Sequence, residues 1–396
     1  MAIGIPSNRN GARIACTLVY PSQMTWSEVL ALPGNAGHKV PCGAPCDRLY
    51  RGDNLPILAH LLDDSAVCGQ VRCVYIDPPY ATASSFVDRN VNHAYDDILT
   101  GAVYVEFLRR RLILLHELLA ENGTIFVHLD QKMVFEIKLV MDEIFGRENF
   151  RNFITRKKCN VKNYTRRTFG NISDHILFYS KTGEYVWHRP FQAWTEQRVR
   201  EEYPCVDATS GRRYKRVPVH APGIRNGATG LPWRGKPPPP GKHWQYPPAK
   251  LDALDRNGKI YWSPHGNPRR KVFYDRSQGI PVQDIWLDFK DAHNQNIEIT
   301  GYPTEKNAGL LERIIAATTD KGDWVLDCFC GSGTSLEAAR LLGRRFIGID
   351  DSQAAIDATV RRLANGRQPM GDFAGARRNA GKHQNAAASL FEHALQ

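Results

Sequence analysis

Length and composition exclude several classes of protein before any motif is considered. The chain has 396 residues and a hydrophobic fraction of 42%, which suits two globular domains or one large α/β domain with an insertion. No stretch approaches the roughly 18 consecutive apolar residues of a membrane span, so we expect no membrane partner. The first residues lack the charged start and apolar core of a signal peptide, and we therefore expect a cytoplasmic protein.

The net charge of +11 is concentrated in the middle of the chain. Residues 151–290 hold 27 lysines and arginines against 11 acids, a net charge of +16, and the rest of the chain carries −5. A basic segment on a slightly acidic body indicates a polyanionic partner, most simply nucleic acid. A solvated basic surface without a partner is the alternative.

Cysteine spacing indicates neither disulfides nor a metal centre. The nine cysteines are odd in number and scattered. Cys42 and Cys46 have no matching pair downstream, and Cys328 and Cys330 flank an aromatic residue. Because neither spacing is typical of zinc, we expect no metal ion.

Strand and helix patterns alternate in the first part of the chain. Residues up to 46 show little pattern, and residues 81–100 form a polar stretch that we expect to be a mobile loop. Asn54 is expected to cap a helix, and Asn122-Gly123 to end another. Periodicity predicts strands at 48–51, 71–76 and 124–129, and helices from Asn54, at 104–119 and at 132–145. This alternation predicts a parallel sheet with helices on both faces.

The basic segment interrupts that alternation. A strand is predicted at 175–179, but residues 183–279 are rich in proline, glycine, arginine and aromatic residues. Cations interleaved with aromatic rings can follow phosphates and stack on bases. The candidate DNA-binding residues are Arg212, Arg213, Lys215, Arg216, Arg269, Arg270 and Lys271.

Regular patterns return after residue 281. Helices are predicted at 307–319, 334–342 and 352–363, and strands at 324–327 and 345–350. Beyond residue 365 the sequence has little to bury, and we expect a disordered tail.

The first motif that carries chemistry is Asp77-Pro78-Pro79-Tyr80, directly after the strand at 71–76. The carboxyl ends of strands are where open α/β sheets bind ligands. Asp77 and the carbonyl of Pro78 can accept hydrogen bonds from an amino group while Tyr80 stacks on a flat ring. The motif is short, and a proline-rich turn after a strand is the alternative.

The second motif is a strand, the sequence Asp327-x-Phe329-x-Gly331-x-Gly333, a helix, and a strand that ends in Asp350. This arrangement suits a nucleotide whose ribose hydroxyls bind the second acid. No lysine follows the glycines, which excludes a phosphate-binding P-loop, and Leu336 replaces the third glycine of a dinucleotide fingerprint. An adenosine-bearing ligand without a pyrophosphate remains, which suits S-adenosylmethionine. A glycine turn that binds no ligand is the alternative.

Together the two motifs, separated by a basic variable segment, resemble the beta-class amino DNA methyltransferases. The resemblance implies a Rossmann-like, circularly permuted α/β methyltransferase sheet in which the catalytic half precedes the cofactor half. Its substrate would be double-stranded DNA, and a homodimer and a cognate restriction endonuclease stay open as partners. The implied organisation is an N-terminal extension (1–46), a catalytic half (47–182), an inserted target-recognition region (183–283), a cofactor-binding half (284–364) and a tail (365–396).

The resemblance also implies residue roles. Asp77, Pro78, Pro79 and Tyr80 would hold the extruded base. The residues implied to hold S-adenosylmethionine are Asp53, Thr304, Lys306, Asp327, Phe329, Gly331, Gly333 and Asp350. The family usually has proline after the lysine at position 306, where this chain has Asn307.

Three functions are compatible with these motifs. Family members whose catalytic motif begins with Asp mostly modify adenine, so adenine-N6 methylation is the leading hypothesis. Methylation of the cytosine N4 amine is the second, because the same site shape serves both amines. A DNA-binding protein whose methyltransferase core no longer turns over is the third.

Overall fold

The computed structural model describes residues 17–42, 47–79, 101–160, 167–277, 279–289 and 306–365, together with the backbone of the strand pair β4 (Ser84–Val87) and β5 (His93–Asp97). The chain divides into two compact units, one formed by residues 1–190 with 283–396 and the other by Phe191–Val282. Tyr80 and Thr304 lie outside the described residues, as do most of the expected loop at 81–100 and the tail after residue 365.

The larger unit contains a nine-stranded sheet in the order β1-β2-β19-β18-β3-β6-β8-β7-β17. Its strands are β1 (His38–Val40), β2 (Arg48–Arg51), β3 (Val71–Ile76), β6 (Leu119–Leu129), β7 (Phe150–Lys157), β8 (Ser173–Ser180), β17 (Ile285–Trp286), β18 (Trp324–Asp327) and β19 (Arg345–Asp350). Strands β2, β19, β18, β3 and β6 are parallel neighbours, and β8 is antiparallel to both β6 and β7. The expected parallel sheet is therefore confirmed in the centre, and antiparallel pairs occur on both sides of it, since β1 is also antiparallel to β2.

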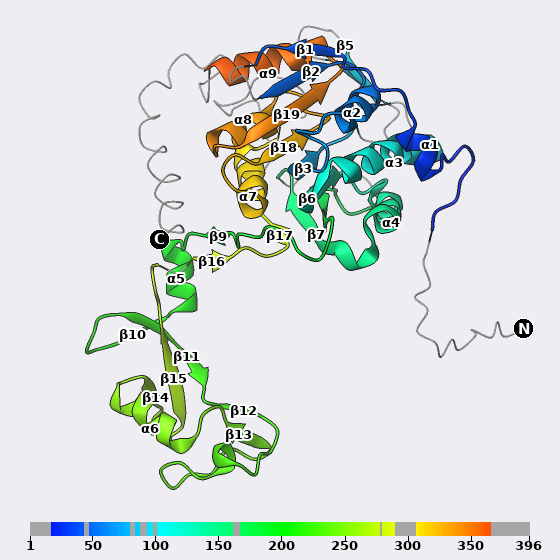
Figure 1. Ribbon diagram of the computed structural model, residues 1–396. Coiled ribbons are helices and arrows are strands. Elements are labelled where there is room, and N and C mark those ends of the chain that lie inside the picture. The colour runs from blue at the N-terminus through cyan, green and yellow to red at the C-terminus, as the bar shows by residue number, and fades with distance from the viewer. Residues whose placement is uncertain are drawn as a thin grey trace, which may run out of the picture. The chain divides into compact units, whose positions relative to one another are not determined.

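Helices cover both faces of this sheet (Figure 1). Helices α2 (Asn54–Leu62), α3 (Gly101–Leu118) and α4 (Val134–Phe145) pack together, and so do α7 (Ala308–Thr318), α8 (Thr334–Leu341) and α9 (Gln353–Asn365). The central strands are continuous apolar runs because both faces are covered. Val74, Ile76 and Leu326, for example, are fully buried. No helix in the described parts is long and apolar enough to cross a membrane.

Two sequence expectations at element ends were wrong. Asp53, not Asn54, caps α2, because its carboxylate accepts the amide of Leu55 at 3.0 Å while the Asn54 side chain bonds elsewhere. Asn122-Gly123 does not end a helix but lies inside β6, which already begins at Leu119. A Cβ at Gly123 would lie 2.8 Å from the carbonyl oxygen of Val71, so the irregular register of β3 and β6 needs a glycine there.

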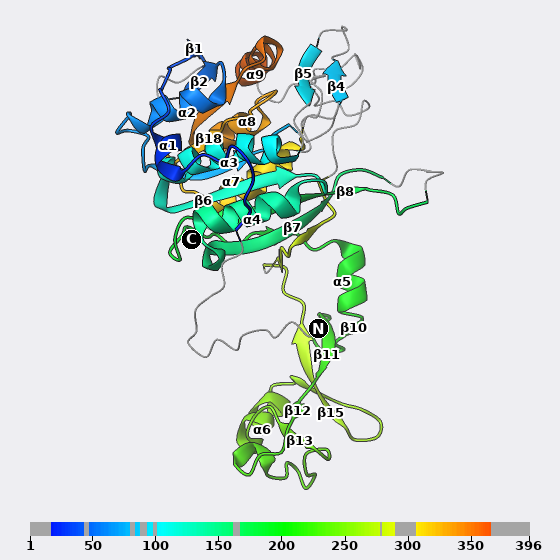
Figure 2. The same cartoon turned by 90° about the vertical axis from the view of Figure 1, so that its right-hand side faces the viewer.

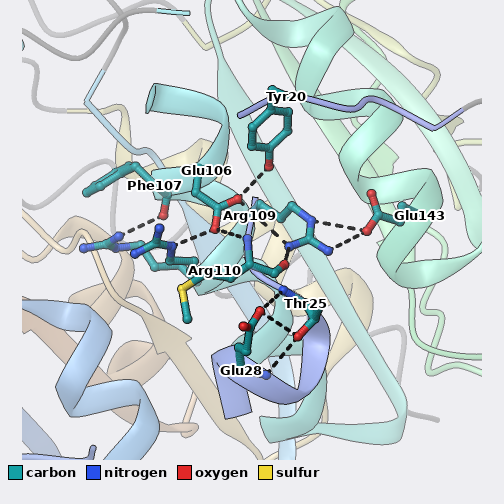
Figure 3. A network of polar contacts seen from close by, with 10 residues as sticks. Tyr20, Thr25, Glu28, Glu106, Phe107, Arg109, Arg110 and Glu143 are labelled. Carbon is teal, nitrogen blue, oxygen red and sulfur yellow. Dashed lines mark hydrogen bonds and ion pairs between the residues drawn. The ribbon is translucent and has the colours of Figure 1, made fainter. Parts of the chain in front are cut away.

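The N-terminal segment is tied to the larger unit by a network of ion pairs and hydrogen bonds (Figure 3). Glu106 in α3 accepts from the Tyr20 hydroxyl at 2.7 Å and from the Met24 amide at 3.1 Å. Arg109, one turn further, donates to the Met24 carbonyl at 2.6 Å and to Glu143 in α4 at 2.7 Å. These bonds pair buried charges that would otherwise be costly. They fix the short helix α1 (Trp26–Leu30), which carries a capping box of Thr25 and Glu28, beside α3.

The smaller unit has a sheet and a core of its own. Its elements are β9 (Phe191–Gln192), α5 (Glu196–Glu202), β10 (Cys205–Val206), β11 (Arg213–Pro218), β12 (His220–Pro222), β13 (Lys242–Trp244), α6 (Pro248–Arg256), β14 (Ile260–Trp262), β15 (Pro268–Phe273) and β16 (Ile280–Pro281). Four of the strands form an antiparallel sheet in the order β10-β11-β15-β14, seen from two directions in Figures 1 and 2. Trp233, Trp244, Leu251 and Ile260 are buried together beside it. Short 3-10 turns occur at Arg147–Asn149 in the larger unit and Ala228–Gly230 in the smaller one.

One close approach in the larger unit gives a stability prediction. A Cβ at Gly348 in β19 would lie 2.3 Å from Cδ1 of Leu336 in α8, a fully buried side chain. We expect Gly348→Ala to lower the free energy of unfolding by about 1–3 kcal/mol, as overpacking does. Urea unfolding of the parent, Gly348→Ala, Leu336→Ala and the double variant measures this. The double variant should lose less than the sum of the two single losses, because the methyl group then occupies vacated space. Additive losses would contradict the contact.

Candidate active site

Four aspartates follow or end neighbouring parallel strands of the larger unit. Asp77 comes directly after β3, Asp327 ends β18, Asp350 ends β19, and Asp53 comes two residues after β2. These strands are adjacent in the order β2-β19-β18-β3, so their carboxyl ends lie along one edge. The sheet thus brings together residues of both sequence motifs, which are about 250 positions apart. Ligands of open α/β sheets bind at such an edge.

Asp77 is held by a lysine from the distant segment before α7. The Nζ atom of Lys306 lies 2.6 Å from Oδ2 of Asp77, and both side chains are largely buried. Pro78 and Pro79 follow Asp77 and have no amide proton to donate, so this backbone offers only carbonyl acceptors. The sequence placed Lys306 beside the cofactor. The structure places it against the residue predicted to bind the base amine.

The glycine turn after β18 is fixed by hydrogen bonds to both acids. Asp327 accepts from the amide of Phe329 at 3.0 Å and from the hydroxyl of Ser335 in α8. Asp350 accepts from the amide of Gly331 at 2.8 Å and from that of Ser352 at 3.0 Å. Each carboxylate oxygen that accepts one of these bonds has a further lone pair for a ligand hydroxyl.

Helix α9 packs against the same turn. The Thr359 hydroxyl donates to the carbonyl of Gly331 at 2.9 Å, and Arg362 donates to the carbonyl of Ser332 at 2.8 Å. Gly333 has a φ of +76°, and a Cβ there would lie 2.7 Å from Oγ1 of Thr359. Glycine is therefore required at this position for both conformation and space.

Burial dominates the electrostatics of this edge. It raises the pKa of Asp327 to about 7 and that of Asp350 to about 6. Asp77 and Asp350 add to the effect on Asp327, since a nearby negative charge disfavours a second one. These buried acids hold their protons more strongly than an exposed aspartate does, and a nearby cation would favour their ionised forms. This edge does not suit a phosphate, in agreement with the exclusion of a P-loop.

Sequence reasoning missed a buried bridge between Asp53 and the glycine turn. Arg111 in α3 donates to Asp53 at 2.9 Å and to the side chain of Asn54, which in turn donates to the carbonyl of Cys328 at 2.6 Å. The guanidinium of Arg111 also lies 3.7 Å from the ring centroid of Phe107, which contacts Phe329. The pattern around Arg111 is an ordinary amphipathic helix, so only the buried arginine at an otherwise apolar stripe could have drawn attention to it.

A second missed feature is a buried polar chain that runs across the sheet beside Asp77. The hydroxyl of Tyr75 lies 2.8 Å from Nδ1 of His128, and Nε2 of His128 lies 3.5 Å from Asp174. Lys158 completes the chain, donating to Asp174 at 2.8 Å. Burial lowers the pKa of His128, so the ring is neutral near pH 7. Tyr75 belongs to β3, so this chain supports the strand directly before Asp77-Pro78-Pro79.

The predicted DNA-binding residues lie in the smaller unit, on two strands paired with each other. Arg213, Lys215 and Arg216 belong to β11, with Arg212 just before it, and Arg269, Arg270 and Lys271 belong to β15. Their side chains alternate between the two faces of the sheet, so they do not form one cluster. The described residues include no group of three or more His, Cys, Asp and Glu side chains that could hold a metal ion.

A model of the DNA methylase family, of the N6/N4 type, matches residues 71–361, nearly three quarters of the chain. The chain belongs to this DNA methylase family. The type II methyltransferase M.EcaI of Enterobacter cloacae is 52% identical over 304 residues, which cover 77% of this chain and 67% of that protein. The Mod subunit of the type III restriction-modification enzyme StyLTI of Salmonella typhimurium is 28% identical over 360 residues, 79% of this chain and 53% of that protein.

Among solved structures, the M1.HpyAVI–SAM complex is 18% identical with a TM-score of 0.43. It matches 80% of this chain and 98% of that one. The chain spans two thirds of the type II relative and about half of the type III Mod subunit. Family membership agrees with the Rossmann-like sheet and with the order of the two motifs. In this DNA methylase the motif with Asp77 precedes the glycine turn, and the two meet because β3 and β18 are neighbours.

The raised pKa of Asp327 gives a prediction for the pH dependence of stability. An unfolded aspartate has a pKa of about 3.9, so between about pH 4 and pH 7 the folded protein binds more protons at this site than the unfolded chain. The stability that Asp327 contributes is therefore full at low pH and is lost as pH rises through this window. Asp327→Asn removes the titration, so the unfolding free energy of the variant relative to the parent should rise between about pH 4 and pH 7 and then level off.

Urea unfolding at a series of pH values measures this difference. A flat difference for Asp327→Asn would mean that Asp327 is ionised throughout the range.

Proposed function

We propose that this DNA methylase transfers a methyl group from S-adenosyl-L-methionine to the exocyclic N6 amine of an adenine flipped out of double-stranded DNA. One observation carries the proposal: the neighbouring strands β3 and β18 place Asp77-Pro78 beside the glycine turn of Asp327 to Gly333. An acceptor pair for an amine and a turn for an adenosine then share one edge. We propose the smaller unit as the target-recognition region.

The residues of the glycine turn fit the cofactor. Asp350 is positioned to accept from the ribose hydroxyls, the backbone at Gly331 and Gly333 allows close approach, and Phe329 offers an apolar surface. Asp350, whose pKa is about 6, provides negative charge near pH 7 for a ligand that carries a sulfonium and an ammonium group, and such a cation would favour ionisation of Asp327. When bound, the cofactor supplies an electrophilic methyl group.

Asp77 and the Pro78 carbonyl prepare the nucleophile. The lone pair of an aromatic amine is delocalised into the ring. When Asp77 and the Pro78 carbonyl each accept a hydrogen bond from one N–H of the amine, they favour a pyramidal nitrogen. Its lone pair is then free to attack in line. Positioning supplies much of the rate in such a transfer. Lys306 holds the Asp77 carboxylate in place, and the carboxylate can receive a proton from the methylated amine. Flipping costs a few kcal/mol, which stacking on Tyr80 would offset.

Transfer of labelled methyl groups to mixed genomic DNA, followed by nucleoside chromatography, tests the proposal. N6-methyladenine is expected, and N4-methylcytosine would support the second hypothesis, because Asp77 and Pro78 can bind either amine. If no methyl group is transferred although the protein still binds cofactor and DNA, the third hypothesis is favoured, a DNA-binding protein whose methyltransferase core no longer turns over. We also propose a cytoplasmic location and, as in restriction-modification systems, a cognate endonuclease. Sedimentation of the purified chain tests whether it forms a homodimer.

We expect Asp77→Ala to abolish methyl transfer and to leave cofactor affinity within a few-fold of the parent, because Asp77 faces the base amine. Single-turnover transfer and calorimetric titration measure the two quantities. Asp320→Ala, a change to an exposed acid before the opposite end of β18, is the matched control and should retain turnover. Near-parental transfer by Asp77→Ala would remove this residue from the mechanism.

We expect Asp350→Ala to weaken cofactor binding by about 1.5–3 kcal/mol, the range for a hydrogen bond to a charged group. The reason is the loss of the ribose acceptor and of the acceptor for Gly331. Calorimetry with S-adenosylmethionine measures it, with Asp351→Ala as the control for charge. Unchanged affinity for Asp350→Ala would mean that the ribose binds to another group.

A further inference from the structure

The antiparallel sheet of the smaller unit presents two chemically different faces. In β11 and β15 the paired residues are Tyr214 with Phe273, Arg216 with Lys271, and Pro218 with Arg269. Directly paired residues of an antiparallel ladder lie on the same face, and successive residues alternate. These six side chains, together with Arg212, which lies over Phe273, and Tyr261 of β14, form what we call the arginine face.

The opposite face is covered by the two helices of this unit. Arg213 donates to the carbonyl of Tyr203 at the end of α5, at 3.3 Å, and Lys215 lies 3.4 Å from Glu202. At the other end of the same face, Ile260 is buried in the tryptophan core with Leu251 of α6. Arg213 and Lys215 therefore hold α5 against the sheet. The run of four cations at 212–216, which the sequence suggested as one DNA-binding cluster, is divided between a covered face and an open one.

Three arginines of the arginine face are exposed: Arg212, Arg216 and Arg269. Within the described residues, no ion pair joins any of the three to a carboxylate. The guanidinium of Arg212 lies 4.8 Å from the ring centroid of Phe273, and that of Arg216 lies 3.7 Å from that of Tyr261. An arginine stacked on a ring keeps its N–H groups directed outward at the edge of the plane, where acceptors can bind.

Lys271 on the same face is different. Its Nζ atom lies 2.7 Å from Asp207, and its side chain is only 16% exposed. Its charge is therefore already balanced. The positive charge available to a partner comes from the three arginines. Contacts with aromatic rings already restrict the Arg212 and Arg216 side chains, so less conformational entropy is lost when they bind a partner.

We propose that the arginine face binds the sugar-phosphate backbone of double-stranded DNA through Arg212, Arg216 and Arg269, and that Arg213 and Lys215 take no part. This inference rests on the proposed function, since it assigns the DNA surface of the proposed target-recognition region. Charge complementarity selects the occupant. Guanidinium groups form paired hydrogen bonds with phosphate oxygens, and the open face has exposed cations without paired acids.

Binding of a labelled random-sequence duplex to the full chain tests the proposal, because non-specific affinity reports phosphate contacts. The test variant carries Arg212→Gln, Arg216→Gln and Arg269→Gln. The control variant carries Arg200→Gln, Lys250→Gln and Arg256→Gln, on the exposed sides of α5 and α6. Both variants lose three positive charges from the same unit, so general attraction is reduced equally. Only the test variant changes the arginine face.

The dependence of log affinity on log salt should become shallower by about 2–3 in the test variant, because each lost phosphate contact removes about 0.9 from the slope. The control should keep a slope within about 0.5 of the parent. Equal slopes for both variants, or a larger loss in the control, would overturn the proposal. Affinity for S-adenosylmethionine, measured by calorimetry, should equal that of the parent in both.

The proposed catalytic function is tested separately in the same preparations. If the parent binds duplex but transfers no methyl group, the proposed catalytic function is wrong. The salt dependences of the two variants still show whether the arginine face binds DNA. If the parent transfers methyl groups, the test variant should show a raised DNA requirement and a maximal rate close to that of the parent. A reduced maximal rate with unchanged DNA requirement would contradict a role limited to backbone binding.

Discussion

The larger unit depends on how four carboxylates are accommodated at one edge of its parallel sheet. Asp77, Asp327, Asp350 and Asp53 meet there because β3, β18, β19 and β2 are neighbours and run in the same direction. Burying an acid without partners is costly. The three buried acids have specific partners: Lys306 for Asp77, and amides of the glycine turn for Asp327 and Asp350. Asp53 is exposed, and it pairs with the buried guanidinium of Arg111. The segment before α7, the glycine turn and helix α3 supply these partners.

Those partners come from segments far apart in the sequence, which connects the site to the packing. Arg111 belongs to α3, and the same helix carries Glu106 and Arg109, which fix the N-terminal segment (Figure 3). Thr359 and Arg362 of α9 hold the glycine turn from the other side. Helices on both faces of the sheet thus have a second role beyond covering the core, since they position the turn and its acids. Changes in α3 or α9 can therefore affect the site without contact with a ligand.

The glycine turn also shows why its sequence departs from a dinucleotide fingerprint. A third glycine in the helix usually allows close packing of helix and strand. In this chain Leu336 occupies that helical position, and the small residue is Gly348 on the facing strand, where a Cβ would approach Leu336 within 2.3 Å. Helix α8 and strand β19 thus still approach each other closely, but the glycine lies on the strand and the large side chain on the helix.

Most elements around the site, and both motifs, could be predicted from the amino-acid sequence, because apolar periodicity and turn residues are local properties; β7 was not predicted. The strands at 71–76, 324–327 and 345–350 were predicted with their observed bounds, as was the helix capped by Asn307 to within one residue. Which charged groups pair with one another became known from the three-dimensional fold. The pairing of Lys306 with Asp77 and the bridge from Arg111 to Cys328 join residues more than 200 positions apart, and no local pattern encodes such contacts. In the smaller unit, whose short strands lack a clear period, the structure alone assigned Arg213 and Arg216 to opposite faces, because strand pairing fixes the alternation.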